Sequence, residues 1–351
     1  MSAVSVMDGA KSGERRHPTL LEEGALAGVL ARLSGKRIYC FENPGGNNGD
    51  RLIYEGSAFA LRSAGAVLVE TPEQAEVIVF TGGFYVSDKW PDGLDVLRDY
   101  NERLPDTPIV LLPQSFWFTT TDFPSLFASR RAPAQIFVRE TTSYDIIKEM
   151  VFPGDVSLGL GDDMALSLRG APWRDRYLAK SAAKHIIVIE RIDKESPHNK
   201  MRLQTPDRYV GKKGFKGLLK QFIPMSTKRA MRRKRAWNTA RTLEQTSTFA
   251  AFARETVRRE HPELADLPIA YGDISLPDLV DFDGFCSMIA EAGVVFSDRL
   301  HGGICAAMLD KPTYIRPSDN HKIPGIHALS LTEMSHVTLL DRYDGAGGRP
   351  G

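Results

Sequence analysis

Short apolar runs rich in β-branched residues recur along the chain, with helical or loop-rich stretches between them. This alternation is typical of parallel sheets built from βαβ units. The expected strands of a first set are Arg37–Phe41, Ala66–Glu70, Val77–Thr81, Pro108–Pro113 and Ile136–Arg139, and those of a second set are His185–Glu190, Ile269–Tyr271, Val294–Ser297, Thr313–Ile315 and His336–Leu340. The pattern therefore predicts an α/β protein with two parallel sheets.

Several stretches between those strands place apolar residues at helical spacing, which predicts amphipathic helices. The expected helices are Leu52–Leu61, Ser247–Arg258 and Leu279–Ala292. A boundary is expected near residues 170–184, where GAPWRDRYLAKSAAK combines turn residues with charges. We therefore expect two Rossmann-like domains facing a cleft, at residues 36–175 and 176–345, after a tail and lead-in helix at residues 1–35.

The composition fits a soluble globular protein, because 42% of the 351 residues are hydrophobic and 25% are charged. No apolar run approaches the roughly 18 residues that a membrane span requires. The N-terminus lacks the apolar stretch of a secretory signal. Cys40, Cys286 and Cys305 have no CxxC spacing, which favours reduced thiols over a disulfide framework or a zinc cage. We expect a cytoplasmic protein.

The net charge of +1 conceals a strong asymmetry. Residues 208–243 hold 12 Lys and Arg and no Asp or Glu, so the rest of the chain carries 33 basic residues against 44 acidic ones. Such a block indicates an anionic partner, and its interleaved Phe215, Phe222 and Trp237 suit a segment lying on an anionic membrane surface. A solvated insertion, or a helical hairpin packed on the second domain, explains the block equally well.

A Gly/Asn-rich segment, ENPGGNNGDR at residues 42–51, follows the first expected strand and directly precedes a helix. Glycines let a backbone approach a ligand, and a helix N-terminus offers unpaired N–H groups. The segment contains neither GxGxxG nor GxxxxGK[ST], so it is not a dinucleotide fingerprint or a P-loop. Asp50 lies where a helix cap would lie, and it is therefore either a functional carboxylate or a cap.

The segment VVFSDRLHGGICAAMLDKP, residues 294–312, combines a strand end with a helix start. Arg299 and His301 would lie at the carboxyl end of a parallel strand, beside Gly302 and Gly303, where open α/β sheets bind ligands. An arginine can grip a carboxylate or phosphate with two hydrogen bonds, and a histidine can donate a hydrogen bond or a proton. An anion is the natural ligand here, and a structural salt bridge is the alternative.

Polar residues end two more expected strands. Gln114 and Ser115 end LLPQS, and Arg139 ends IFVRE, with Ser143 in the next turn. These positions suit ligand contacts at the carboxyl edge of a sheet, and they also suit ordinary turns and caps.

Two further segments supply carboxylates. GDDMAL contains Asp162 and Asp163, and capping of a following helix explains them at least as well as a functional role. The DFD at Asp281–Asp283 resembles the metal-binding DxD of some sugar-nucleotide enzymes, although a helix cap is the favoured interpretation. The chain has no HExxH, no GxSxG and no Cys/His cluster, so zinc and serine hydrolases have no motif support.

Together these motifs resemble a known family. GNNGDRLI, VRETTSYDI, GDDMAL, SDRLHGGICAAMLDKP and DNHKI occur in the order found in polysaccharide pyruvyl transferases, and the resemblance runs from about residue 36 to 327. It implies a fold of the GT-B type, phosphoenolpyruvate as donor, and a sugar of a growing, lipid-linked glycan as acceptor. By motif match, Asp50, Arg139, Arg299 and His301 would be donor-site and catalytic positions. A basic insertion at about 194–240 departs from the family pattern.

The chemistry that this resemblance implies agrees with the residues. Phosphoenolpyruvate carries a carboxylate and a phosphate, so its site needs concentrated positive charge. Arg299 and Arg139 are expected to bind it. The expected substrate-binding set is completed by Asn48, Gly49, Gly302, Gly303, Gln114 and Ser115.

Ketal formation needs one general acid and one general base. His301 is the expected acid or phosphate-side donor and Asp50 the expected base, although the two roles can be exchanged. The scheme needs no metal and no cofactor.

Two other functions remain open at this point. A GT-B glycosyltransferase using a nucleotide sugar would employ the same fold and the same Arg and His residues on a diphosphate. A non-catalytic protein that binds polyanions through residues 208–243 would show a steep salt dependence, although no nucleic-acid partner is expected.

Overall fold

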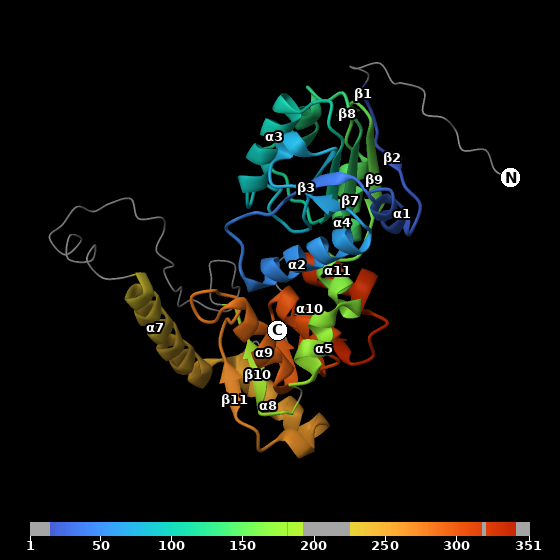
Figure 1. Cartoon of the computed structure of the whole chain (residues 1–351). Coiled ribbons are helices and arrows are strands. Elements are labelled where there is room, and N and C mark those ends of the chain that lie inside the picture. The colour runs from blue at the N-terminus through green and yellow to red at the C-terminus, as the bar shows by residue number, and fades with distance from the viewer. Residues whose placement is uncertain (1–14, 181, 192–224, 318–320, 342–351) are drawn as a thin grey trace. The chain divides into compact units, whose positions relative to one another are not determined.

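The structure is a computed structural model that describes residues 15–180, 182–191, 225–317 and 321–341. The chain divides into two compact units, each with its own parallel sheet (Figure 1). Unit 1 takes in the chain up to Gly45, Ile53–Leu168 and Ala328–Ser330, and unit 2 takes in Gly46–Leu52, Arg169–His327 and the chain from Leu331 onward. Unit 2 therefore includes a short segment from the N-terminal part of the sequence.

Unit 1 contains a seven-stranded parallel sheet in the order β2-β9-β7-β6-β5-β3-β4. Its strands are β2 (Thr19–Leu20), β3 (Arg37–Phe41), β4 (Val67–Leu68), β5 (Val77–Phe80), β6 (Ile109–Gln114), β7 (Ala134–Val138) and β9 (Val156–Leu160). The short strands β1 (Arg15–Arg16) and β8 (Phe152–Pro153) form a separate antiparallel pair. The chain winds from β3 to β4 on one side and to β5 on the other, which makes the gap between β3 and β5 the topological switch point.

Unit 2 contains a five-stranded parallel sheet in the order β11-β10-β12-β13-β14. Its strands are β10 (His185–Ile189), β11 (Ile269–Tyr271), β12 (Ala292–Ser297), β13 (Thr313–Ile315) and β14 (Val337–Leu339). This winding repeats that of unit 1, and the switch point lies between β10 and β12. Ligands of open α/β sheets bind outside the carboxyl ends of the strands at such a point.

Helices connect the strands in both units. Those of unit 1 are α1 (Ala25–Ala31), α3 (Asp92–Arg103) and α4 (Thr141–Lys148), together with α2 (Asn48–Ser63), whose first residues belong to unit 2. Those of unit 2 are α5 (Pro172–Leu178), α7 (Met225–Thr246), α8 (Thr248–Glu260), α9 (Phe282–Ala290), α10 (Leu300–Met308) and α11 (Lys322–Ile326). No helix in the described ranges is long and apolar enough to cross a membrane.

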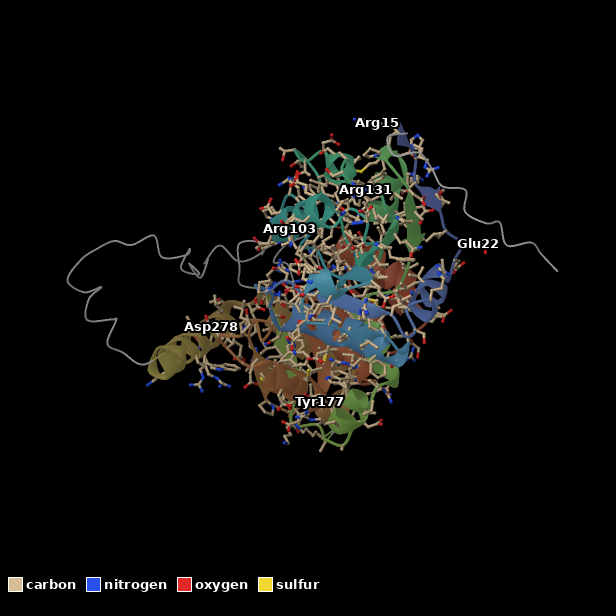
Figure 2. The ribbon with its side chains drawn as sticks, turned by 45° about the horizontal axis from the view of Figure 1, so that its top comes forward. Arg15, Glu22, Arg103, Arg131, Tyr177 and Asp278 are labelled. Atoms are coloured by element: carbon tan, nitrogen blue, oxygen red, sulfur yellow. The ribbon has the colours of Figure 1, made fainter. Side chains whose placement is uncertain are left out.

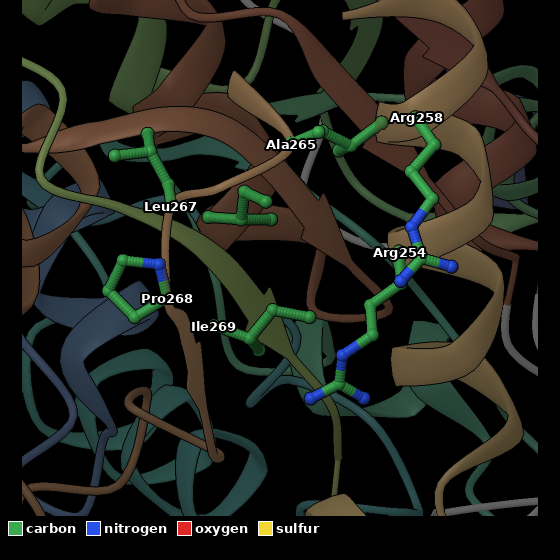
Figure 3. Close-up of a pocket in the computed structure, with 8 residues that line it drawn as sticks. Arg254, Arg258, Ala265, Leu267, Pro268 and Ile269 are labelled. Atoms are coloured by element: carbon green, nitrogen blue, oxygen red, sulfur yellow. The ribbon is translucent and has the colours of Figure 1, made fainter. Parts of the chain in front are cut away.

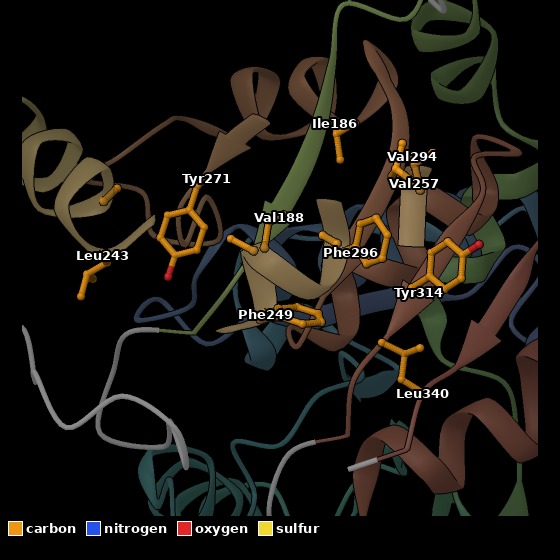
Figure 4. Packing of buried hydrophobic residues seen from close by; sticks show 13 residues of the cluster. Ile186, Val188, Leu243, Phe249, Val257, Tyr271, Val294, Phe296, Tyr314 and Leu340 are labelled. Atoms are coloured by element: carbon orange, nitrogen blue, oxygen red, sulfur yellow. The ribbon is translucent and has the colours of Figure 1, made fainter. Parts of the chain in front are cut away.

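The core of unit 2 forms where α8 packs on the sheet (Figure 4). Phe249 of α8 lies against Phe296 of β12, which stacks on Tyr314 of β13 at a ring-centroid distance of 4.7 Å. Ala240 and Leu243, at the end of α7, are buried in the same cluster. The apolar residues at this end of the basic block therefore pack on unit 2, as the hairpin interpretation predicts. Residues 208–224 of the block lie outside the described residues.

Charged side chains mostly lie at the surface. Arg103 contacts Asp99 and Glu73, and Arg131 contacts Asp106 (Figure 2). Exposed pairs of this kind stabilise a protein by about 0–1 kcal/mol. Three arginines differ because they form buried ion pairs, namely Arg139, Arg299 and Arg316. Arg139 and Arg316 directly follow the ends of β7 and β13, and Arg299 lies two residues after the end of β12.

The prediction of an α/β protein with two parallel sheets is confirmed, and each expected strand forms with a shift of a few residues at its ends. Some details differ. The observed strands β1, β2, β8 and β9 are not among the expected ones. The helix expected from Leu52 begins at Asn48, so the Gly/Asn-rich loop is shorter than expected. The reason for the earlier start is a cap supplied by Asn47, which belongs to the site.

Candidate functional site

The site in unit 2 is built at the carboxyl edge of its sheet. β12 ends at Ser297, and helix α10 begins three residues later at Leu300. Arg299 takes the N-cap position with extended backbone angles, φ −97° and ψ 117°. This strand-to-helix turn beside the switch point positions Arg299 and His301, as the sequence predicts for a ligand-binding edge.

Arg299 is held by Asp273, a residue that sequence reasoning did not select. The Nε atom of Arg299 donates to Asp273 Oδ1 at 3.0 Å, and its Nη2 donates to Oδ2. Both side chains are buried, with Asp273 0% and Arg299 6% exposed. A bidentate ion pair of this kind fixes the plane of the guanidinium. Asp273 lies just after β11, and its only sequence signal is its position at a strand end.

His301 lies in the first turn of α10, half-buried and against the first turn of α2. A Cβ atom added to Gly49 would lie 2.8 Å from the Cβ of His301. Gly49 is therefore needed for this close approach of the two helix starts, because any side chain at this position would collide with His301. Direct contact between the substrate and Gly49 stays a prediction.

Asp50 takes part in a reciprocal cap of α2. The side chain of Asn47 accepts a hydrogen bond from the Gly49 N–H at 2.7 Å, while Asp50 Oδ2 accepts one from the Asn47 N–H at 2.8 Å. This is the capping-box arrangement, with Asn47 as the N-cap and Asp50 three residues later. The cap uses one carboxylate oxygen of Asp50. The other oxygen, Oδ1, makes no hydrogen bond to the described residues, so a structural and a chemical role are compatible.

Asn48 ties the start of α2 to the loop between β11 and α9. Its amide nitrogen Nδ2 donates to the carbonyls of Ile274 and Val280 at 2.9 and 3.0 Å, and its backbone N–H donates to Ser275 at 2.8 Å. Both amide hydrogens are thus engaged by backbone carbonyls. Because the same loop carries Asp273, a single segment positions Arg299 and the turn that bears Asp50.

Gly302 and Gly303 let α10 approach the sheet closely. A Cβ at Gly303 would lie 2.5 Å from the Ile315 side chain, and one at Gly302 would lie 2.7 Å from Ser297 Oγ. The Gly303 N–H donates to the Arg299 carbonyl within the helix. Packing therefore accounts for these glycines in the structure, and binding of an anion by their N–H groups stays a prediction.

A buried charge cluster lies at the same edge. The Nη2 atom of Arg316 contacts Glu190 Oε1 at 3.0 Å and Asp298 Oδ2 at 3.2 Å, and its guanidinium lies 3.8 Å above the ring of Phe249. Burial raises the pKa of Asp298 to about 6, although Arg316 opposes the shift. The Arg191 N–H donates to Asp298 at 2.7 Å, which joins the ends of β10 and β12 across the switch point.

Unit 1 has its own buried network at the carboxyl edge of its sheet. The Nη1 atom of Arg139 contacts Asp163 Oδ2 at 2.6 Å, and its Nε donates to Ser115 Oγ at 2.9 Å. Ser115 in turn donates to Glu140 at 3.0 Å. The remaining amino group of Arg139, Nη2, makes no hydrogen bond to the described residues.

Gln114 is fully buried, and its amide nitrogen donates to the Thr81 carbonyl. The structure thus groups the predicted residues in two sets. Asn48, Gly49, Asp50, Arg299, His301, Gly302 and Gly303 belong to unit 2, whereas Arg139, Gln114 and Ser115 belong to unit 1.

The remaining carboxylate candidates have structural partners. Asp281 caps α9 by accepting a hydrogen bond from the Gly284 N–H at 2.9 Å, so the cap interpretation of the DFD segment is confirmed. Asp283 contacts Arg176 and Tyr177, and Asp162 accepts a hydrogen bond from Ser330. Among the described residues, no group of three or more His, Cys, Asp and Glu could hold a metal ion.

A small cavity of about 200 Å³ lies elsewhere in unit 2, beside α8 (Figure 3). Val257 and Leu267 are among its apolar walls, and Arg254 and Arg258 extend beside it. It lies at the start of β10 and β11, whereas Arg299 and His301 follow the end of β12. This cavity is therefore separate from the carboxyl edge that carries the predicted residues.

The chain was compared with protein-family profiles, with curated proteins and with solved structures. The profile of the family described as polysaccharide pyruvyl transferase matches residues 47–320, from the cap of α2 past β13. The chain is also similar to the crystal structure of an uncharacterized protein from Klebsiella pneumoniae, with a TM-score of 0.52 and 16% identity over 90% of this chain and 96% of that one. Similarity at this identity concerns the fold alone. No curated protein matches the chain.

Proposed function

Because the chain belongs to the polysaccharide pyruvyl transferase family, we propose that this transferase moves the pyruvyl group of phosphoenolpyruvate onto two hydroxyls of a glycan sugar. The products are a pyruvate ketal and inorganic phosphate. The observation that carries the proposal is the pair Arg299 and His301 at the start of α10, beside the turn of α2 that bears Asp50. The Arg299 guanidinium, the His301 imidazole and the Asp50 carboxylate all belong to unit 2.

Arg299 binds an acidic group of the donor in this proposal. Asp273 fixes the guanidinium before the donor arrives, so little side-chain entropy is lost on binding. Arg139 of unit 1 is the second donor-binding residue, because Asp163 and Ser115 hold its guanidinium while Nη2 keeps its hydrogen-bonding capacity. Buried, preorganised donors of this kind stabilise charge more strongly than solvated ones.

The reaction needs protons to move at two places. His301 protonates the methylene carbon of the enol, which leaves an electrophilic carbon that a sugar hydroxyl attacks. Asp50 accepts the proton of that hydroxyl, and phosphate leaves with the C–O bond electrons and takes this proton. A second hydroxyl then closes the ketal and gives its proton to His301, which restores both residues. Atoms balance because one diol and one phosphoenolpyruvate give one ketal and one phosphate. The assignments of acid and base can be exchanged between His301 and Asp50.

Three finer features belong to the same proposal. We propose that the two units are the halves of a GT-B-like enzyme, with domains at about 36–175 and 176–345 that face a common cleft. We also propose that the acceptor is carried on a lipid and that the enzyme works in the cytoplasm, at an anionic membrane surface. Exposed cations of α7, such as Arg233 and Lys234, support the membrane part.

The function is tested by incubating the protein with lipid-linked oligosaccharides and either phosphoenolpyruvate or nucleotide sugars. We expect phosphate release from phosphoenolpyruvate and a product heavier by pyruvate less one water. His301→Gln should lower the rate by about 10²–10⁴, whereas His17→Gln, at an exposed histidine, should not. Product formed only from a nucleotide sugar would instead establish a glycosyltransferase. Equal rates for both variants would remove His301 from the site.

A further inference from the structure

Two tryptophans stand out at the surface of unit 1. Trp90 is 39% and Trp117 is 45% exposed, and among the described residues no other Phe, Trp or Tyr is exposed. Trp90 lies on the loop after β5 and Trp117 on the loop after β6. Both loops leave the carboxyl edge of the sheet, which is the edge that carries Ser115 and Arg139.

The outward position of Trp117 follows from its neighbours. Phe116 is buried, and the rings of Phe116 and Phe118 stack at 5.6 Å, while Phe118 stacks on Phe123 at 4.7 Å. In an extended segment successive side chains point in opposite directions. With both neighbours bound to the phenylalanine cluster, the indole between them projects from the unit.

Asp88 fastens the two loops together. Its Oδ2 atom accepts hydrogen bonds from the N–H groups of Thr119, Thr120 and Thr121, and its own N–H donates to the Trp117 carbonyl at 2.9 Å. Burial alone would raise the pKa of Asp88, but these hydrogen bonds outweigh it and hold the pKa far below its usual value.

Trp90 belongs to the same assembly. Its N–H donates to the Ser87 carbonyl at 3.1 Å, one residue before Asp88. The two indoles are thus carried by one rigid pair of loops.

This pair of loops is also connected to the buried arginine of unit 1. The Phe116 N–H donates to Ser143 Oγ at 2.8 Å, and the adjacent Ser115 hydroxyl receives the hydrogen bond from Arg139 Nε. Trp117 therefore follows, by two residues, a side chain that holds Arg139. A ligand on the indoles would lie on the same loop system as the second donor-binding residue.

We propose that Trp90 and Trp117 form an aromatic platform on which a pyranose ring of the acceptor glycan stacks. This inference rests on the proposed function, because it assigns the acceptor side of that reaction. One face of a pyranose presents C–H groups, and a flat indole removes that apolar face from water while the hydroxyls at the ring edge stay hydrated. Tryptophan does this at low entropic cost because only two side-chain torsions are fixed.

The chemistry of the surroundings favours a sugar over a protein. A stable protein interface buries about 800 Å² on each partner and has an apolar centre. Here the exposed residues close in sequence are Lys89, Pro91, Asp92, Thr119 and Thr120, most of them polar. The other exposed large apolar residues of unit 1, such as Leu20 and Val67, lie on β2 and β4. Two rigid rings in a polar setting suit one or two sugar units.

The experiment measures binding of three named probes, cellotetraose, maltotetraose and β-1,4-galactotetraose, to the full chain. Saturation-transfer NMR should show transfer to ring C–H protons of at least one probe, and calorimetry gives its dissociation constant. Trp90→Ala and Trp117→Ala should each weaken binding about tenfold or more, as loss of an aromatic hot spot does. Trp117→Phe should retain much of the affinity, and Leu20→Ala, an exposed apolar control in the same unit, should retain all of it.

The platform is overturned if no probe shows saturation transfer, or if the double variant Trp90→Ala, Trp117→Ala binds as wild type does. Binding of phosphoenolpyruvate by the double variant should stay unchanged, since neither indole lies in the donor site. If wild type binds a probe but turns over no phosphoenolpyruvate, the proposed function fails while the platform stands. A normal far-ultraviolet circular dichroism spectrum of Trp117→Phe checks that the loop keeps its fold.

Discussion

Each of the three arginines with a buried ion pair contacts a carboxylate that sequence reasoning could not pair with it. Arg299 contacts Asp273, Arg139 contacts Asp163, and Arg316 contacts Glu190 and Asp298. Removing one partner of a buried pair leaves an uncompensated charge and costs about 3–5 kcal/mol. An alanine substitution at Arg299 or Arg139 therefore tests the fold together with donor binding, and the two effects need separate variants.

Arg299→Ala alone should lower the free energy of unfolding by about 3–5 kcal/mol, because Asp273 stays buried without its partner. The double variant Arg299→Ala, Asp273→Ala should recover much of that stability and still show no transfer, since the donor-binding cation is missing. Urea unfolding and the phosphate-release assay measure the two quantities. A double variant that regains activity would show that Arg299 serves only the fold.

Asp50→Asn separates the cap from the chemistry at a single residue. The amide oxygen of asparagine can still accept the hydrogen bond from the Asn47 N–H, so the thermal midpoint should change by only a few degrees. If Asp50 is the base, kcat should fall by about 10²–10⁴ while the affinity for phosphoenolpyruvate stays close to normal. A variant that keeps its kcat would leave Asp50 with the capping role alone.

Asp298 should make the stability of unit 2 depend on pH. Its folded pKa of about 6 lies above the ordinary value of 3.8, so the folded state binds the proton more tightly than the unfolded state. Its contribution is therefore most favourable below pH 3.8 and is lost as the pH rises through 6, by about 3 kcal/mol in all.

Asp298→Asn removes this dependence. Relative to wild type, the variant should gain stability between pH 4.5 and pH 7, as measured by urea unfolding at several pH values. Parallel pH profiles for the two proteins would show that Asp298 does not titrate in this window.

At the level of elements, the loop between β11 and α9 holds the start of α2 through Asn48 and the start of α10 through Asp273. One loop therefore holds both helix starts, which bear Asp50 and His301, in position. Catalytic groups must be held within a fraction of an ångström of their productive geometry. In the proposed reaction, the loop would therefore affect the rate although none of its residues needs to touch the substrate.

Asn48→Ala should remove two hydrogen bonds to the carbonyls of Ile274 and Val280 and lower the free energy of unfolding by about 1–3 kcal/mol. Because the start of α2 is held less firmly, Asp50 is no longer fixed relative to His301, and kcat should fall more than donor affinity does. Thermal unfolding and steady-state kinetics provide the comparison. If Asn48 instead binds the donor directly, KM should rise while stability is retained.

The proposed binding to an anionic membrane surface depends on the basic residues of helix α7. Trp237 is half-buried against the core of unit 2, whereas Arg233 and Lys234 are exposed. Each Lys or Arg near an anionic surface contributes about 1 kcal/mol, so wild type should sediment with anionic liposomes at low salt and be released as salt rises. A variant with glutamine at four positions should not sediment. The four positions are Arg232, Arg233, Lys234 and Arg235.

A matched control changes four exposed arginines elsewhere to glutamine and should sediment as wild type does. These are Arg32, Arg62, Arg169 and Arg258. Equal sedimentation of the two quadruple variants would attribute any binding to net charge alone. Absence of wild-type sedimentation would leave α7 as a structural or acceptor-binding element.

For the whole molecule, the sequence reveals what depends on neighbours in the chain. Strands such as Ile269–Tyr271 and Thr313–Ile315 are predicted with their observed bounds because apolar runs and turn residues are local signals. Strand-end residues such as Arg299 follow by the same reasoning. Asp273 was not selected, and Asp163 was selected as a carboxylate but not paired with Arg139, since an aspartate after a strand looks the same whether or not an arginine contacts it in the fold.

The capping of α2 shows a second limit. The sequence places Asp50 at a cap position, yet the N-cap is Asn47, and Asp50 closes the motif from inside the helix. Because the capping role of Asn47 was not predicted, the expected helix start, Leu52, differs from the observed start, Asn48. Strand β9, which lies between β2 and β7, was missed for a different reason, because VSLGL is short and contains a glycine, which weakens a strand signal.

The discontinuity of unit 2 has a consequence for synthesis on the ribosome. Asn48 contacts carbonyls that lie 226 and 232 residues later in the chain. At about 5–20 residues per second, the first turn of α2 leaves the ribosome roughly 10–45 s before those carbonyls exist. Unit 1 can collapse early, but the first turn of α2 cannot make these contacts until Ile274 and Val280 have been synthesised. A nascent chain stalled before residue 280 would thus lack the contacts that hold Asp50 beside His301 in the candidate site.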